Sequence, residues 1–481
     1  MQPRGKTSLF VIFAAASAAV AGLLFGYDTA VINGALVYLR AEFQLGSFET
    51  EMVATVLLWG CAAGAALAGW ASDRFGRRVA LFVAGILFCI SAVGAAVPAH
   101  LWQLLMARLL GGLAIGSASL IVPLYIAEIA PAAVRGRLVT LNQLAIVIGI
   151  LVAFVSNYAL AHVTQGSWRW MFGLGAVPAV ALCLSLVWIP ESPRWLLQGG
   201  NREQALTVLT QISPDTDTKA ALEEIGNAIS EESGTYRELF SRKLRKPLEL
   251  TIMLAIIQQV TGINTVLYYG SIVFAEHAGA SASQAIGLNI LVGAVNLLFT
   301  VVALLTIDRL GRRPLLLTAT AGMGLCLAVF AGFLRYLPGH SLVLLVPVLG
   351  YVGCFAFGLG TSVWVCLAEL FPNRIRGRAM SIATMVLWVS VSIVTATFLS
   401  LIKMFSASGV FLGYAGICTL SFLYIYFRLP ETKNRTLEEI EAMWAECKET
   451  SKSEFHCLSE PERNHHENER SIIGRADSPM R

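Results

Sequence analysis

The chain has 481 residues, of which 56% are hydrophobic and 14% are charged, and its formal net charge is +4. Charged residues make up about a quarter of an ordinary soluble domain, so this composition excludes that class and indicates a membrane protein. The nine cysteines show neither the spacing of a disulfide framework nor that of a metal site.

Apolar stretches of the length needed to cross a bilayer, about 20 residues in a helix, recur along the chain. The first of them, Leu9 to Val31, is longer than the core of a signal peptide and has no persuasive cleavage site, so we interpret it as a span. The predicted spans cover residues 8–32, 51–71, 79–98, 102–127, 139–162, 169–189, 248–275, 284–306, 315–334, 343–370, 379–402 and 409–428. Continuous apolar runs favour helices over a barrel, so we predict an all-α membrane protein with 12 transmembrane helices.

Two polar regions divide these spans. Residues 190–247 separate the sixth span from the seventh and carry helical patterning, which predicts short amphipathic helices. The tail at 447–481 is polar and poor in aromatic residues, which predicts disorder. The predicted units are a first six-helix half at 1–189, a loop at 190–247, a second six-helix half with a short cytoplasmic helix at 248–446, and the tail.

The distribution of Lys and Arg predicts the orientation of the chain. Of the thirty-five, thirty fall on the side that holds both termini and the 190–247 loop, and four fall on the other side. Because cytoplasmic loops are enriched in these residues, both termini and the long loop are expected in the cytoplasm.

Three motifs occur once in each half of the chain. SDRFGRR at 72–78 returns as IDRLGRR at 307–313, AEIAPAAVRGR at 127–137 returns as AELFPNRIRGR at 368–378, and PES at 190 returns as PET at 430. Parallel halves of this kind place a substrate site near the bilayer midplane, between them.

Two ionisable residues lie deep in predicted spans, Asp28 in the first and Arg108 in the fourth. A charge at the centre of a membrane helix costs about 3 kcal/mol on insertion scales, so each residue is expected to pair with the other. Desolvation favours the protonated acid and the cation favours the carboxylate, so a conformational change can move a proton on or off Asp28. The alternative is an ion pair that only fixes the packing of two helices.

The repeated basic loops are candidates for a cytoplasmic latch. Each half has an acid at the end of a later span, Glu128 or Glu369, and an arginine seven residues further on, Arg135 or Arg376. Such surface charges can hold one side of a transporter shut and separate when it opens. The alternative is that these arginines only set the topology.

The seventh span contains the most polar segment of any span, QQVTGINTVLYY at 258–269. Its amides suit a polyhydroxylated ligand because each offers a donor and an acceptor. Contacts between helices are the alternative role. The candidate substrate-binding residues are Gln258, Gln259, Asn264 and Tyr268 here, Gln143 and Asn296 on neighbouring spans, and Trp364 and Trp388, whose rings can cover a sugar.

Taken together, GLLFGYDTAVING, PLYIAEIAPAAVRGRL, PESPRWLL, QQVTGIN, DRLGRRPLL and PETK resemble the sugar porter branch of the major facilitator superfamily, and they occur in that family's order. The resemblance implies two halves that rock in alternating access, a hexose, pentose or inositol-type substrate, and Asp28 and Arg108 as the proton-coupling pair.

The resemblance also implies roles for matching positions. Gln143, Gln258, Gln259, Asn264, Asn296 and Trp364 match sugar-contacting positions of the family. The latch positions are Arg74, Arg77, Arg78, Glu128, Arg135, Glu191, Arg309, Arg312, Arg313, Glu369, Arg376 and Glu431. The chain has Leu387 and Val391 where many hexose transporters of the family carry an amide, so the second-half side of its site is expected to be poorer in hydrogen bonds than a typical glucose site. Ile150 stands where xylose symporters of the family have a second glutamine and where its glucose facilitators also have isoleucine.

The function expected from these residues is proton-coupled import of a monosaccharide, or of a polyol such as myo-inositol, across the plasma or inner membrane. A facilitator without proton coupling and a non-transporting sugar sensor are the alternatives. No nucleophile with a base, metal cluster or phosphate-binding loop is recognisable, so we expect neither an enzyme nor a cofactor other than the coupled proton. The expected partners are the sugar, protons and the lipid bilayer, without nucleic acid, and the protein is expected to act as a monomer.

Overall fold

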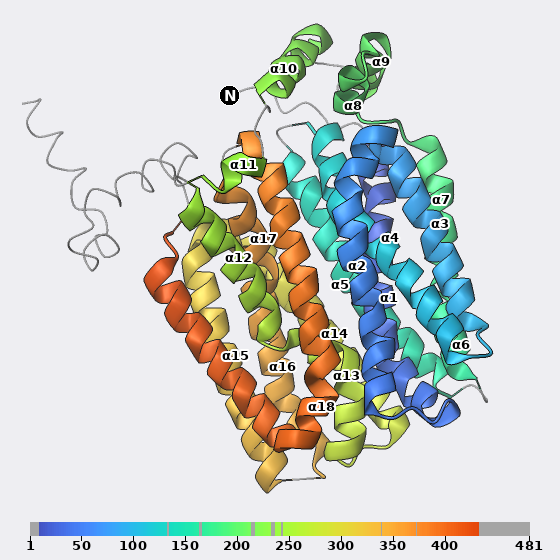
Figure 1. Cartoon of the computed structure of the whole chain (residues 1–481), viewed down its shortest axis with the longest axis vertical. Coiled ribbons are helices and arrows are strands. Elements are labelled where there is room, and N and C mark those ends of the chain that lie inside the picture. The colour runs from blue at the N-terminus through green and yellow to red at the C-terminus, as the bar shows by residue number, and fades with distance from the viewer. Residues whose placement is uncertain are drawn as a thin grey trace, which may run out of the picture.

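The computed structural model describes residues 9–131, 134–162, 166–212, 217–231, 236–241, 244–337, 339–371 and 373–431. The regular elements in these ranges are α-helices, as predicted (Figure 1). The predicted short helix before residue 446 and the predicted disordered tail lie outside the described residues, and the boundaries proposed for the four units stay a prediction.

The helices of the first half pack around α1 and α4, and a group of shorter helices follows them in the chain. The first group consists of α1 (Leu9–Glu42), α2 (Ser47–Phe75), α3 (Arg77–Ala96), α4 (Leu101–Ile129), α5 (Arg135–Leu160), α6 (Ser167–Gly173) and α7 (Ala176–Trp188). The shorter helices are α8 (Pro193–Gln198), α9 (Arg202–Ile212), α10 (Thr218–Glu231) and α11 (Tyr236–Leu239).

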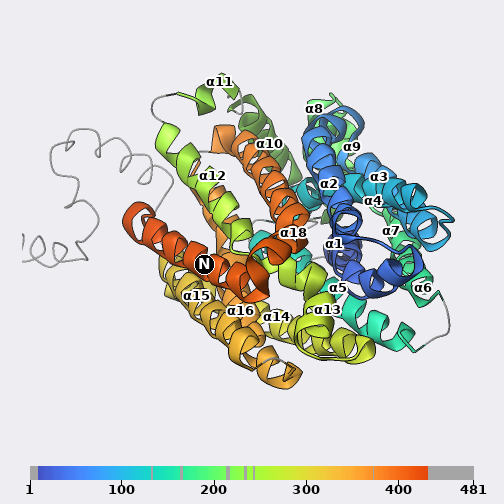
Figure 2. The same ribbon diagram turned by 60° about the horizontal axis from the view of Figure 1, so that its bottom comes forward.

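The second half repeats this arrangement with more interruptions. It consists of α12 (Arg245–Val260), α13 (Ile263–His277), α14 (Ala282–Leu310), α15 (Arg312–Tyr336), α16 (Ser341–Phe357), α17 (Leu359–Glu369) and α18 (Asn373–Arg428). Figure 2 shows α1 to α7 on one side of the molecule and α12 to α18 on the other.

Eleven stretches of the described chain are long and apolar enough to cross a membrane. The last one, Gly377–Arg428, has 52 residues, and a straight helix of that length would measure about 78 Å, more than twice a bilayer core of about 30 Å. The chain turns inside it at Ser406, whose φ of 63° and ψ of 160° are not helical. α18 therefore contains two spans, and the total is twelve, as predicted.

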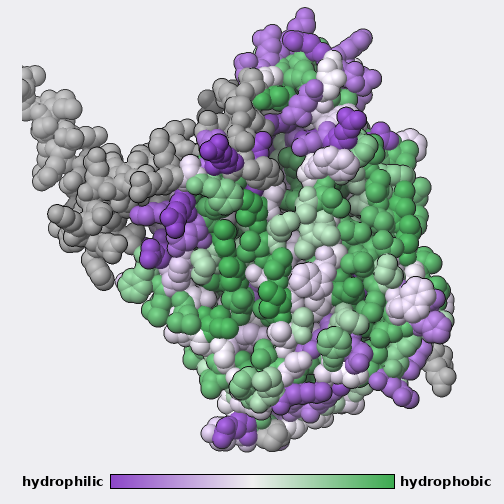
Figure 3. Space-filling model, in the orientation of Figure 1, coloured by the Kyte–Doolittle hydropathy of each residue, from purple (hydrophilic) through white to green (hydrophobic). Residues whose placement is uncertain are grey.

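The surface shows the band that these spans require. Figure 3 shows apolar residues around the middle of the molecule and polar residues at its two ends, with α8 to α10 projecting from one end. Large apolar side chains of the spans, such as Trp59, Leu305 and Leu420, are exposed. Contact with lipid is favourable for such apolar side chains, whereas contact with water would be unfavourable. We call the end with α8 to α11 and both DRxGRR loops the basic end.

Three spans that the sequence predicted as single helices are interrupted. One break separates α6 from α7, one lies at Thr261 and Gly262 between α12 and α13, and one lies at Gly358 between α16 and α17. Gly262 has a φ of 90°, which a residue with a side chain rarely adopts. The interruption leaves the Thr261 carbonyl oxygen without a helical hydrogen bond, and this oxygen accepts a hydrogen bond from Tyr351 Oη at 2.9 Å. Such a bond makes an interruption tolerable at membrane depth.

Contacts within each half are tight because small residues face one another. α2 packs on α4 through Gly60 and Gly112, and a Cβ on Gly112 would come 2.0 Å from the Leu57 carbonyl oxygen. The halves themselves meet through α2 with α18, α5 with α14 and α1 with α13. Close helix approach through glycine is typical of membrane proteins, where packing replaces the hydrophobic effect.

The glycine of each DRxGRR loop is required by the fold. Gly76 and Gly311 have φ values of 98° and 90°, and a Cβ on them would lie 2.3 Å from Glu191 Oε2 and 2.8 Å from Glu431 Oε2. Each glycine therefore lets a glutamate approach the start of the following helix.

We expect Gly76→Ala to lower the free energy of unfolding by about 1–2 kcal/mol, because alanine is disfavoured at positive φ and would displace Glu191. Gly69→Ala in α2 is the control, since no atom lies within 4 Å of the added Cβ. Thermal unfolding of the detergent-purified variants measures both. Equal midpoints for the two variants would contradict this reading.

Candidate functional site

Asp28 and Arg108 lie together in the centre of the first half. Arg108 Nη1 donates to Asp28 Oδ1 at 2.6 Å and to the Asp28 carbonyl oxygen at 3.0 Å. The Arg108 side chain is 1% exposed and that of Asp28 is 16% exposed. The structure thus brings the two ionisable residues together and joins α1 to α4 by a buried ion pair.

Aromatic side chains surround this pair. The Arg108 guanidinium lies 5.4 Å from the centre of the Phe172 ring, a cation–π distance. Tyr27, the neighbour of Asp28, donates its hydroxyl to the Met171 carbonyl oxygen at 2.6 Å. These contacts hold α6 against α1 and α4 and limit the movement of the ion pair.

The amides predicted in the seventh span form a connected cluster at the break between α12 and α13. Asn264 Nδ2 donates to Gln259 Oε1 at 2.5 Å, and Gln259 Nε2 donates to Gln258 Oε1 at 3.4 Å. Gln258 Nε2 donates to the Leu359 carbonyl oxygen at 3.0 Å, at the start of α17. The cluster therefore ties two helix breaks of the second half to each other.

The other candidate substrate residues come from different helices. Gln143 lies on α5, Asn296 on α14 and Trp364 on α17, and α14 packs against both α5 and α17. Tyr268 and Trp388 are buried, and Trp388 meets Phe25 of α1 at 5.6 Å between ring centres. Phe25 and Trp388 thus bring the two halves into contact at the level of Asp28, three residues along α1.

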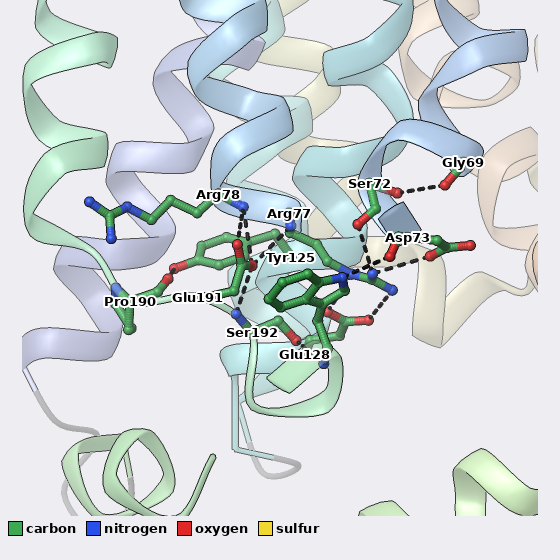
Figure 4. A network of polar contacts seen from close by, with 11 residues as sticks. Gly69, Ser72, Asp73, Arg77, Arg78, Tyr125, Glu128, Pro190, Glu191 and Ser192 are labelled. Atoms are coloured by element: carbon green, nitrogen blue, oxygen red, sulfur yellow. Dashed lines mark hydrogen bonds and ion pairs between the residues drawn. The ribbon is translucent and has the colours of Figure 1, made fainter. Parts of the chain in front are cut away.

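The basic end of the first half contains a compact network of charges (Figure 4). Arg77 binds Glu128 through Nε to Oε2 at 3.1 Å and Nη2 to Oε1 at 3.3 Å, and it also pairs with Asp73. The side chains of Arg77 and Glu128 are 4% and 5% exposed. In the second half the equivalent pair is Arg312 with Glu369, at 2.9 Å.

Glu191 and Glu431, predicted as latch residues, each lie against the first residues of a helix from elsewhere in the same half. Glu191 accepts hydrogen bonds from the backbone N–H groups of Arg77 and Arg78 at the start of α3, at 2.9 and 3.1 Å. Glu431 accepts from Arg312 and Arg313 at the start of α15, both at 3.1 Å. A carboxylate there satisfies free N–H groups and the helix dipole, so both glutamates cap helices.

The remaining latch candidates either bond the end of another span or are exposed. Arg78 and Arg313 reach carbonyl oxygens at the end of the last span of their half, Leu186 and Tyr426, at 2.8 and 2.7 Å. Arg74, Arg135 and Arg309 are exposed. The side chain of Arg376 lies outside the described part of the chain. Glu128 and Glu369 thus pair with the DRxGRR arginines of their own half, and the latch role of these residues stays a prediction.

In the described part of the chain, His, Cys, Asp and Glu form no group of three that could hold a metal ion. The cysteines described there are free thiols.

Residues 14–444 match the protein family described as "Sugar (and other) transporter". The chain belongs to this family. It is 38% identical to a D-xylose transporter of Levilactobacillus brevis over 88% of this chain and 93% of that protein. It is 37% identical to an arabinose-proton symporter of Bacillus subtilis over 92% and 96% of the two chains.

A solved structure also resembles this sugar porter closely. The inward-open conformation of the xylose transporter XylE from Escherichia coli has a TM-score of 0.80 and 35% identity, and the match covers 90% of this chain and 100% of that one. The protein is therefore a multi-pass membrane transporter with the major facilitator fold and not an enzyme, as the sequence predicted.

Sequence reasoning missed the residues that join the halves of this sugar porter at the end opposite the basic end. Asn33 of α1 donates to the Leu267 carbonyl oxygen at 2.8 Å and accepts from the Ser271 backbone N–H at 3.0 Å. It also bonds the Ser271 hydroxyl and the Asn289 side chain. The sequence signal that could have indicated this contact is the polar asparagine five residues after Asp28.

Glu51 makes a second connection between the halves. Its carboxylate accepts hydrogen bonds from the backbone N–H and the hydroxyl of Ser400 in α18, both at 2.7 Å, and its side chain is buried. Arg40 pairs with Glu276, and His162 contacts Ser283, near the same end. Glu51 was overlooked because it lies at the first residue of a predicted span, where a charge is ordinary.

We expect the thermal stability of Glu191→Gln to depend less on pH than that of the wild-type protein. Burial raises the pKa of Glu191 above its ordinary value of 4.5, and the N–H groups around it offset this only in part. The stability that a raised carboxyl pKa contributes is complete below the ordinary value and is lost as the pH rises through the raised one.

Unfolding midpoints between about pH 4 and about pH 7 measure this effect, because glutamine does not titrate and lacks the loss that linkage predicts. Glu203→Gln in α9 changes the same group at an exposed position. Parallel curves for the wild type and Glu191→Gln would rule out titration of Glu191 in this window.

We expect Glu51→Gln and Asn33→Ala each to favour opening of the end opposite the basic end. Each removes hydrogen bonds between the halves. One bond to the Glu51 carboxylate contributes about 1.5–3 kcal/mol and each neutral bond of Asn33 about 0.5–1.5 kcal/mol, so either loss changes the equilibrium about tenfold. Labelling of a cysteine introduced at Phe25 by a membrane-impermeant maleimide measures access. Glu49→Gln, two residues from Glu51, is the control and should be labelled at the same rate as the protein that carries only the introduced cysteine. Equal labelling of Glu51→Gln, Asn33→Ala and this control would show that these bonds do not hold the halves together.

Proposed function

We propose that the protein carries a monosaccharide into the cell together with a proton, by alternating access between its two halves. The observation that carries this proposal is the buried pair of Asp28 and Arg108, in the centre of one half and beside the interface between the halves. Relatives named as an arabinose-proton symporter and a D-xylose transporter support both the proton and the sugar.

The chemistry of the pair fits proton coupling. With Asp28 ionised, its charge and that of Arg108 cancel, and the 2.6 Å hydrogen bond holds α1 to α4. Protonation removes one charge and leaves the buried guanidinium without a counter-ion, which is costly at low dielectric. The protonated and ionised proteins therefore favour different packings of α1 against its neighbours, which is what coupling requires.

The amide cluster is the proposed sugar site. Gln258, Gln259 and Asn264 offer donors and acceptors at the broken seventh span, where the two halves meet, and the sugar would replace the hydrogen bonds that they now make with one another. Phe25 and Trp388 would cover an apolar ring face. The remaining proposed contacts are Gln143, Tyr268, Asn296 and Trp364. Pentoses, hexoses and polyols such as myo-inositol all suit this chemistry.

The conformation and orientation follow from the same features. The Asn33 and Glu51 contacts join the halves opposite the basic end, and the similar XylE structure is an inward-open one. With the basic end in the cytoplasm, as the Lys and Arg distribution favours, the structure is an inward-facing state. We propose no cofactor, the proton being the coupled ion, and a monomer as the functional unit.

We expect Asp28→Asn to abolish accumulation while leaving exchange intact, because it fixes the acid in a neutral form and so removes the proton from the cycle. Proteoliposomes loaded at neutral pH, given an inward proton gradient and supplied with labelled xylose, glucose, galactose or myo-inositol, measure accumulation. Counterflow of the same compound without a gradient measures exchange. Asp217→Asn, the same substitution at an exposed position, is the control.

Accumulation of one compound by the wild type, abolished by a protonophore, would name the substrate and support symport together. A wild type that only equilibrates the compound, with Asp28→Asn unchanged, would show a facilitator in which the ion pair is structural. Binding without flux would instead indicate a sensor.

A further inference from the structure

The two oxygens of the Asp28 carboxyl group are not equivalent. Oδ1 accepts the hydrogen bond of Arg108 at 2.6 Å. Oδ2 is buried and has no hydrogen-bond partner among the described residues. An acidic proton can therefore bind Oδ2 without first displacing the guanidinium, so Oδ2 is the oxygen at which protonation starts.

The hydroxyl of Ser91 lies beside this free oxygen. A Cβ placed on Gly111 would lie 2.4 Å from Ser91 Oγ and 2.7 Å from Asp28 Oδ2. The two oxygens are therefore no more than 5.1 Å apart, the sum of these two distances. One water, at hydrogen-bond distance from each, spans such a gap. Ser91 is itself 2% exposed, so its hydroxyl is directed into the protein.

A small cavity also reaches Asp28, and neither Ser91 nor Gly111 lines it. It is lined by Leu24, Tyr27, Phe88, Ala92, Phe172 and Gly175, from α1, α3, α6 and the break after α6. Its size suits a single water, and a water needs polar partners such as Asp28. All the lining residues belong to the first half, whereas the amide cluster belongs to the second. The cavity therefore reaches Asp28 from a side that the proposed sugar site does not occupy.

We propose that Ser91 positions the proton donor of Asp28: a water held between Ser91 Oγ and Asp28 Oδ2, over Gly111, hands the coupled proton to Oδ2. In this step an O–H bond of a hydronium ion breaks, the Oδ2–H bond forms, and neutral water stays bound to Ser91. Release runs in reverse. Gly111 has no side chain, so nothing on α4 at this position pushes the two oxygens apart. The inference rests on the proposed proton coupling and assigns it a site, separate from the sugar.

Few titratable groups face this site. Among the described residues they are Arg108 from α4, Tyr27 from α1 and Cys61 from α2, and Tyr268 from α13 interacts with Arg108 and Cys61. Thiols, phenols and guanidinium groups ordinarily titrate at alkaline pH, so a change in the pH profile of transport between about pH 5 and about pH 8 reports on Asp28. Ser91 does not titrate and acts through Asp28, as a positioning residue.

The test uses four variants in proteoliposomes, with the compound that the wild type accumulates as the probe. Ser91→Ala removes the hydroxyl, Ser91→Thr keeps it, and Gly111→Ala places a methyl group against both Ser91 Oγ and Asp28 Oδ2. Gly94→Ala is the control, because its Cβ would meet only the Ala107 side chain, at 3.1 Å, in the same contact of α3 with α4. Each variant is measured in proton-driven uptake over a range of pH and in counterflow.

We expect Ser91→Ala to slow proton-driven uptake about tenfold and to shift its pH profile, as loss of a hydrogen bond to a charged group should, while counterflow stays unchanged. Ser91→Thr should restore uptake, and Gly111→Ala should resemble Ser91→Ala. Should Gly111→Ala fail to fold, the Ser91 variants alone decide. Gly94→Ala should resemble the wild type.

An unchanged pH profile and uptake in Ser91→Ala would overturn the proposal, and so would equal losses of uptake and counterflow that threonine does not restore. The Asp28→Asn variant shows whether the Ser91 proposal alone is wrong or whether proton coupling through Asp28 is also wrong. If Asp28→Asn loses accumulation and Ser91→Ala does not, coupling stands and the Ser91 site falls. If Asp28→Asn still accumulates the compound, both fall.

Discussion

The buried ion pair of Asp28 and Arg108 is the constraint on which the first half depends. Burying an unpaired ion costs several kcal/mol even after relaxation, so neither residue is tolerated at this depth without the other. Their contact fixes α1 against α4 and places Phe172 of α6 over the guanidinium. Because the pair is held by charge, adding a proton changes the energy of the same contact that positions the helices. Packing and proton binding therefore cannot be separated here.

Contacts within the halves differ in kind from the contacts between them. Inside each half, buried arginine–glutamate pairs and glutamates at helix starts tie spans to one another, at equivalent positions in both halves. Between the halves, asparagine and serine hydrogen bonds, the carboxylate of Glu51 and the more exposed Arg40–Glu276 pair make the connection. Buried ion pairs within each half suit halves that move as bodies, with the Phe25–Trp388 contact at their interface.

Much of this arrangement was predictable. The twelve apolar spans, the helical fold, the repeat of the two halves and the pairing of Asp28 with Arg108 follow from hydropathy, motif spacing and the cost of a buried charge. The breaks at Gly262 and Gly358 did not follow, because glycine is common in membrane helices. Neither the positive φ of Gly262 nor the non-helical backbone of Gly358 has a signature in composition. Glu191 and Glu431 illustrate another limit: their motif was recognised, but a carboxylate that caps a helix and one that latches a gate look alike in sequence.

The sequence by itself determined the solvent, the fold class and the family, because these depend on the length and spacing of apolar runs and on local motifs. Tertiary structure decided which partner each polar group has. It paired Glu128 with Arg77 rather than with Arg135, directed Glu51 and Asn33 across the interface, and placed Ser91 beside the free oxygen of Asp28. Such contacts join residues far apart in the chain over a few ångströms, so their geometry exists only once the helices have packed.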